Sequence, residues 1–122
     1  MASSPNTASA RLLLVAGGLC GAAGVALSAV AAHIGGGNIG TAASFLLVHG
    51  PAFLALASLP FSRGTMAGAC SILLGLALFA GDLLSRHYLG GRLFPMAAPA
   101  GGLLLIAGWL AIALSALLRP ST

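Results

Sequence analysis

Four long apolar stretches, separated by short polar or glycine-rich segments, constrain this chain more than any other feature. A helix that crosses a bilayer needs about 20 mainly apolar residues, because each residue rises about 1.5 Å and the hydrocarbon is about 30 Å thick. The stretches that meet or approach this length are 12–34, 41–59, 66–85 and 99–118. Their apolar residues are continuous rather than alternating, which excludes a membrane β-barrel.

The scarcity of charge supports the same interpretation. Charged residues are only 5% of the chain, whereas an average soluble domain carries about 25% to keep its surface in water. This composition excludes a soluble enzyme and a disordered tail. The net charge of +4 comes from five arginines that are scattered singly, so it forms no basic patch for nucleic acid. The expected partner is the lipid bilayer.

The short connections between the stretches predict how the helices are arranged. Loops of this length force neighbouring helices to lie antiparallel. We therefore predict an all-α integral membrane protein, an up-down four-helix bundle that forms a single domain over residues 12–119. A polar tail over residues 1–11 precedes it, and a short tail over 120–122 follows. The first stretch is too long for the apolar region of a cleaved signal peptide, which is normally 7–15 residues.

Glycine and other small residues recur at helical spacing on two of the predicted helices. Lipid tails are as apolar as leucine, so helices associate in a bilayer through close backbone contact at such residues. The predicted contact positions are Gly17, Gly21, Gly24 and Ser28 on the first helix, and Gly64, Gly68 and Gly75 on the third. We expect these faces to pack within the monomer, with a dimer interface as the alternative.

Four polar side chains are expensive to place in a bilayer and need an explanation. They are His33, His49, Asp82 and Arg86, and the antiparallel arrangement puts all four toward one side of the membrane. Asp82 precedes Arg86 by four residues, the favoured order for an ion pair along a helix. We interpret this pair as structural. The alternative is a proton, ion or ligand site that Asp82 forms with one or both histidines.

We expect His49 to connect two helices. Pro51 follows it by two residues and has no backbone N–H, so the carbonyl of Leu47 loses its usual donor. A neutral imidazole donates one hydrogen bond and accepts another, which suits a residue beside such a break. We predict that His49 points into the bundle and bonds to another helix, with Asp82 and the residues near Ser28 as partners in reach.

More specific chemistry finds little support in these residues. A metal site needs three or four ligands, and no local spacing such as HxxxH supplies them. A bis-histidine haem requires two histidines at one depth, whereas His33 and His49 differ by about 10 Å along their helices. A proton-coupled exporter needs a deep carboxylate, and Asp82 lies near a helix end. We therefore assign no catalytic, cofactor-binding or metal-binding residue and expect no cofactor.

Four segments, in order along the chain, resemble the helix motifs of a known family. They are 26–33 (ALSAVAAH), 45–50 (FLLVHG), 75–83 (GLALFAGDL) and 99–109 (PAGGLLLIAGW). The family is the small four-span membrane proteins catalogued as domain of unknown function 423, found mainly in bacteria. The resemblance implies a four-span fold, with Gly101, Gly102 and Trp109 in helix packing, and it brings no established activity. The family often has serine where this chain has Asp82, which weakens a functional role for the carboxylate.

These observations together predict a non-enzymatic multi-pass protein of the bacterial inner membrane. A small transporter or channel, and an accessory subunit of a larger membrane complex, remain alternatives, as does a homo-oligomer. Arg11, Arg63 and Arg119 lie at the end of the predicted bundle that carries both termini, against Arg86 and Arg92 at the other. The positive-inside rule therefore predicts that both termini face the cytoplasm.

Overall fold

The chain forms four helices in the computed structural model, which describes residues 7–119. They are α1 (Thr7–Ile34), α2 (Gly37–Ala57), α3 (Arg63–Tyr88) and α4 (Ala97–Leu118). No strand occurs among the described residues, so the all-α fold class is confirmed. Each of the four helices is long and apolar enough to cross a membrane. Residues 1–6 of the predicted N-terminal tail and the predicted tail over 120–122 lie outside the described residues.

The helix limits differ from the predicted ones by two to five residues at six of the eight ends. Residues 7–11 belong to α1 rather than to a tail, because this segment contains no glycine or proline to interrupt a helix. The helix ends where Gly35 adopts a left-handed φ of 91°. The Gly35 N–H donates to the Ala31 carbonyl at 2.9 Å, which closes the last turn.

Serine side chains set the two helix ends around the second connection. The Ser62 hydroxyl accepts a hydrogen bond from the Thr65 N–H at 3.5 Å and caps the start of α3. A serine in this position satisfies an amide that the first turn leaves free. The Ser58 hydroxyl donates to the Ala55 carbonyl at 2.7 Å, and α2 ends just before it. This end comes two residues before the predicted end at residue 59.

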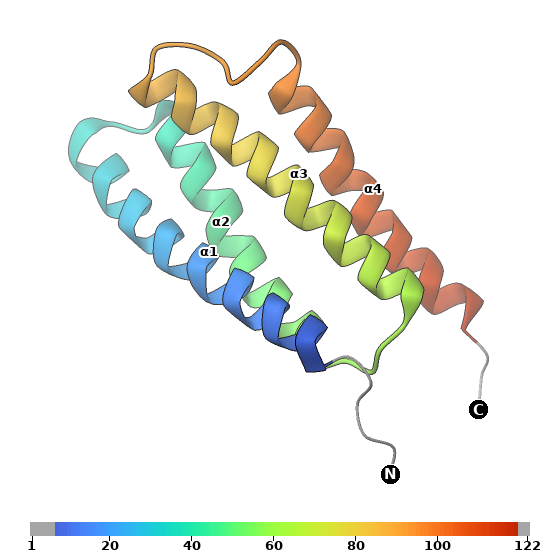
Figure 1. Cartoon of the computed structure of the whole chain (residues 1–122). Helices are drawn as coiled ribbons and strands as arrows, with labels where there is room; N and C mark the ends of the chain where they lie inside the picture. Colours follow the sequence, from blue (N-terminus) through green and yellow to red (C-terminus); the bar gives the residue numbers. More distant parts are fainter. Residues whose placement is uncertain (1–6, 120–122) are drawn as a thin grey trace.

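The helices are arranged as two tightly packed pairs. Figure 1 shows the chain reversing direction at each connection, with α2 between α1 and α3. Contacts are most extensive between α1 and α2 and between α3 and α4, and less extensive between α2 and α3. Within residues 7–119, α1 and α4 make no extensive contact with each other. The two pairs are therefore joined mainly through α2 and α3, where Phe53 and Ile72 are fully buried.

Reciprocal glycine contacts bring the backbones of α3 and α4 together. A Cβ atom placed on Gly68 would lie 2.8 Å from the carbonyl oxygen of Gly108, and one placed on Gly108 would lie 2.7 Å from that of Gly68. Gly75 and Gly101 form a second pair, with the corresponding distances 2.6 and 2.7 Å. Real Cβ atoms essentially never come this close, so each backbone occupies the space of the side chain that its partner lacks.

The contact between α1 and α2 also depends on glycine, at positions that partly differ from the predicted ones. A Cβ atom on Gly17 would lie 2.8 Å from the Gly50 carbonyl oxygen, and one on Gly24 would lie 2.7 Å from the Leu47 side chain. By contrast, a Cβ atom on Gly21 would meet nothing within 4 Å. The buried face of α1 is made by Leu13, Gly17, Cys20 and Gly24. Gly21 lies beside this face: a Cβ atom on Gly50 would lie 3.0 Å from the Gly21 backbone nitrogen, so the Gly21 backbone approaches α2 although its own side-chain position is open.

Gly64 and Gly102, two other glycines predicted to pack against a neighbouring helix, also differ from each other in their surroundings. A Cβ atom on Gly64 would lie 2.8 Å from the Ser115 side chain, so α3 approaches α4 closely there. At Gly102 the same added atom would meet nothing within 4 Å, which corrects the predicted packing role of that residue. The difference is rotational, because Gly102 follows Gly101 by about 100° around α4.

These distances predict opposite effects of alanine at two glycines. Gly68→Ala should lower stability by about 1–3 kcal/mol, because the added methyl group must push the α4 backbone away. Gly21→Ala should leave stability unchanged or raise it by up to about 1 kcal/mol, since alanine favours a helix over glycine. Thermal unfolding of the two purified variants in detergent measures both effects. Equal losses would contradict the assignment of the two faces.

Candidate functional site

His49 lies at the middle of α2, and both of its ring nitrogens are hydrogen-bonded. Its side chain is buried, with 5% of the residue exposed. Nδ1 lies 2.8 Å from the Phe45 carbonyl oxygen, and the indole Nε1–H of Trp109 donates to Nε2 at 3.1 Å. A carbonyl only accepts and an indole N–H only donates. The contacts therefore define a neutral imidazole that carries its proton on Nδ1.

The hydrogen bond between His49 and Trp109 connects the two helix pairs near the middle of α2 and α4. Each residue lies 12 positions after the first residue of its helix, or about 18 Å along the axis. Aromatic rings surround the imidazole, with the centroids of Trp109 at 5.7 Å, Phe45 at 6.1 Å and Phe53 at 6.5 Å. This contact joins α2 directly to α4.

The partners of His49 differ from the predicted ones. Trp109 supplies the hydrogen bond from another helix, rather than Asp82 or a residue near Ser28. Within α2, His49 bonds to the carbonyl of Phe45 and not to that of Leu47, which the proline leaves without its usual donor. The imidazole of His49 folds back along α2 and bonds to the carbonyl four residues earlier, that of Phe45.

Asp82 forms the second polar centre, near the end of α3. The side chain is fully buried, and Oδ2 lies 3.0 Å from both Nε and Nη2 of Arg86. Oδ1 accepts a hydrogen bond from the backbone N–H of Leu93 at 2.8 Å. The neighbouring Ser85 hydroxyl donates to the Gly91 carbonyl at 2.6 Å. Both side chains thus attach the connection between α3 and α4 to the last turns of α3.

The structure does not join the four predicted polar residues into one cluster. Asp82 and Arg86 form the expected ion pair, His49 bonds to Trp109, and His33 is exposed at the end of α1. Across residues 7–119, no three His, Cys, Asp or Glu side chains gather as a group that could hold a metal ion. The arrangement provides two separate structural centres, each with its polar atoms already bonded inside the chain.

A third polar group, which sequence reasoning missed, lies where α3 begins and α4 ends. The Ser115 hydroxyl lies 3.2 Å from that of Ser62 and 3.4 Å from that of Thr65. Nη2 of Arg119 donates to the Thr65 hydroxyl at 3.4 Å. A serine shortly before an apolar stretch is a typical capping signal, which could have identified Ser62 from the sequence. Its pairing with Ser115 across 53 positions depends on the register of two helices, so no local pattern indicates it.

The fold and these centres define an all-α protein with four helices of membrane-spanning length. The sequence profile of a family described as Protein of unknown function (DUF423) matches residues 20–102. This match covers more than half of the chain, which therefore belongs to that family. It ends before Trp109, so the partner of His49 lies outside the matched residues. Neither a curated protein nor a solved structure matches the chain.

Removing the indole N–H tests the connection between α2 and α4. Trp109→Phe keeps an aromatic ring but leaves Nε2 of His49 without its donor, so it should cost about 0.6 kcal/mol and at most about 1.7 kcal/mol, the mean and the maximum measured for hydrogen bonds between membrane helices. In a double-mutant cycle with His49→Phe, the combined loss should be smaller than the sum of the two. Thermal unfolding in detergent gives all four values. Additive losses would refute a direct bond, and Tyr88→Phe, at an exposed ring, serves as control.

Asp82 should control the order of the connection over residues 89–96. Asp82→Ala removes both acceptors and should cost about 1–3 kcal/mol, while Asp82→Asn keeps a carbonyl for the Leu93 N–H and should cost less. Hydrogen exchange of the amides in this segment should quicken more in the alanine variant. Arg92→Gln, at an exposed residue of the same segment, is the matched control. Unchanged exchange in Asp82→Ala would show that other contacts hold the segment.

Proposed function

We propose that the protein is an integral membrane protein of the bacterial inner membrane, with its four helices crossing the bilayer in up-down order. The length and hydropathy of all four helices support this location. The outer helices support it further, because only 22% of the most apolar window of α1 and 17% of that of α4 is buried inside the protein. A bilayer supplies the apolar surroundings that the remaining leucines, isoleucines and valines need.

We propose that both termini face the cytoplasm. Figure 1 places the start of α1, the second connection and the end of α4 at one end of the molecule. Arg11, Arg63 and Arg119 belong to that end. At the opposite end Arg86 is neutralised by Asp82 at 3.0 Å, which leaves Arg92. The unpaired arginines therefore number three against one, and the positive-inside rule favours cytoplasmic termini.

Reporter fusions test this orientation. Alkaline phosphatase fused after residue 122 should be inactive, whereas the same reporter inserted after Gly91 should be active in the periplasm. Arg92→Gln should leave both activities unchanged, since it only increases the charge difference. Strong phosphatase activity at the C-terminal fusion, together with none at the internal site, would reverse the orientation.

We further propose that the protein acts by association with other membrane components, as an accessory subunit, rather than by catalysis or transport. One observation carries this proposal: both buried centres, His49 and Asp82, use their polar atoms in bonds within the chain. A residue that relays protons or holds a solute needs a free lone pair or proton at the transport path. Proton or solute transfer through either residue would first require these bonds to break.

Site-specific photocrosslinking in native membranes tests the accessory role. A photoreactive residue in place of Leu110, which is 63% exposed on α4, should form an adduct of fixed mass with one membrane protein. The same residue in place of Leu105, which is 5% exposed, should react only within the chain. Adducts with lipid alone at position 110 would contradict the proposal. Solute flux in proteoliposomes of the pure protein, abolished by His49→Leu, would establish transport instead.

A further inference from the structure

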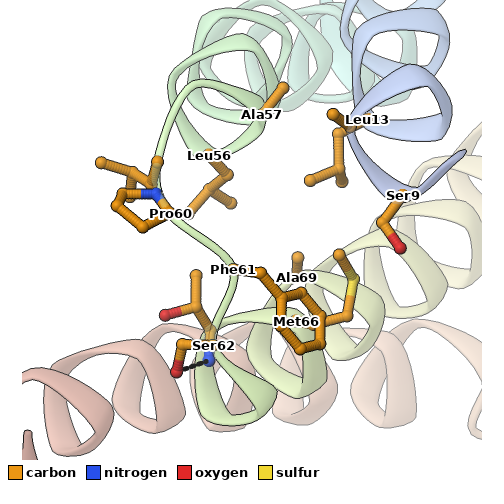
Figure 2. A pocket seen from close by; sticks show the side chains of 12 residues that line it. Ser9, Leu13, Leu56, Ala57, Pro60, Phe61, Ser62, Met66 and Ala69 are labelled. Atoms are coloured by element: carbon orange, nitrogen blue, oxygen red, sulfur yellow. Dashed lines mark hydrogen bonds between the residues drawn. The ribbon is translucent and has the colours of Figure 1, made fainter. Parts of the chain in front are cut away.

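An apolar pocket opens between the start of α1, the end of α2 and the start of α3. Figure 2 shows its lining, with Leu13 and Leu56 on one side and Met66 and Ala69 on the other. Three residues that carry a hydroxyl group, Ser9, Ser62 and Thr65, also belong to the lining. The pocket lies at the arginine-rich end of the molecule. Apolar walls that end in hydroxyl groups suit a molecule with an apolar body and a polar head.

A second hollow adjoins this pocket and has a different chemical character. It is lined by Arg63 and Arg119 together with the hydroxyls of Ser62 and Ser115. Ser62 lines both spaces, so they adjoin at this residue. The hydroxyl of Thr65 lines the apolar pocket and holds the guanidinium of Arg119 at 3.4 Å. One arginine is therefore positioned by a residue of the neighbouring pocket.

The two arginines lack a counter-charge within the chain's side chains. Asp82 is the sole acidic side chain in the sequence. It forms an ion pair with Arg86 near the C-terminal end of α3, far from Arg63 at the start of that helix. Guanidinium groups beside hydroxyl donors are the usual ligands of phosphate oxygens in proteins. The hollow is thus complementary to an anion with several acceptor oxygens, and the apolar side chains of its neighbour can contact part of a hydrocarbon chain.

We propose that this end of the molecule binds one anionic phospholipid, with its phosphate between Arg63 and Arg119 and an acyl chain in the pocket beside Leu13 and Leu56. The inference rests on the proposed membrane location. It requires the start of α3 to lie at headgroup level, where phosphate and hydrocarbon meet. A free phosphate ion would satisfy the arginines but would leave the apolar pocket without an occupant.

Native mass spectrometry of the full chain from nanodiscs with equal dioleoylphosphatidylglycerol and dioleoylphosphatidylcholine tests the headgroup contact. The wild-type protein should retain phosphatidylglycerol in preference to phosphatidylcholine. Arg63→Gln and Arg119→Gln should each lower this preference about fivefold, the effect expected for one basic residue at a charged membrane surface. Arg92→Gln, at the opposite end, should leave it unchanged. An equal loss in Arg92→Gln, or no loss in the first two variants, would overturn the site.

The acyl-chain contact has its own pair of variants. Ala57→Leu adds a side chain inside the pocket and should reduce retention of phosphatidylglycerol, whereas Ala55→Leu, exposed on the same helix and outside the lining, should not. Inorganic phosphate and glycerophosphoglycerol should compete poorly. Full competition by either would identify a phosphate site without a lipid and overturn the proposal.

Two measurements separate failure of this site from failure of the membrane location. All variants should unfold at the wild-type temperature in pure phosphatidylcholine, so that a changed lipid preference reflects binding and not folding. Protein that resists carbonate extraction but shows no phosphatidylglycerol preference would overturn the lipid site alone. Protein that carbonate releases from membranes would overturn the membrane location itself.

Discussion

Contact between bare backbones at glycine is the interaction on which the rest of the structure depends. Gly68 with Gly108, and Gly75 with Gly101, place each backbone in the space where the other would carry a side chain. In the proposed bilayer location the hydrophobic effect would not hold the helices together, so short backbone distances would supply the packing energy instead. The same proximity allows the hydroxyl of Ser71 on α3 to reach the Leu104 carbonyl on α4 at 2.8 Å.

The polar groups follow from this close packing. A buried polar atom has no solvent to bond with, so each buried polar side chain needs a partner within the protein. His49 finds Phe45 and Trp109, and Asp82 finds Arg86 and the Leu93 amide. Among residues 7–119, no buried side-chain nitrogen or oxygen lacks a partner. The buried polar side chains therefore have a structural explanation: each forms hydrogen bonds that hold two segments of the chain together.

Sequence reasoning recovered what depends on local pattern and missed what depends on rotation and register. The four apolar stretches and the i to i+4 spacing of Asp82 and Arg86 were sufficient for the helices and their ion pair. The exact contact face of α1 could not be predicted in this way, because Gly17 and Gly21 fit one small-residue stripe, whereas only the side-chain position of Gly17 is filled by α2 and that of Gly21 is open. The bond from Trp109 to His49 spans 60 positions, and helical periodicity carries no information on such pairings.

The uneven contacts among the helices have a mechanical consequence. The first hairpin consists of α1 and α2, and the second of α3 and α4. Separating the two helices of either hairpin would break close backbone contacts at glycine, which side-chain movements cannot replace. Between the hairpins, the smaller contact of α2 with α3 and the hydrogen bond from Trp109 to His49 resist displacement. The molecule is therefore stiff within its halves and most compliant along the seam between them. A movement of one hairpin relative to the other would have to break the hydrogen bond between the Trp109 indole and the His49 imidazole.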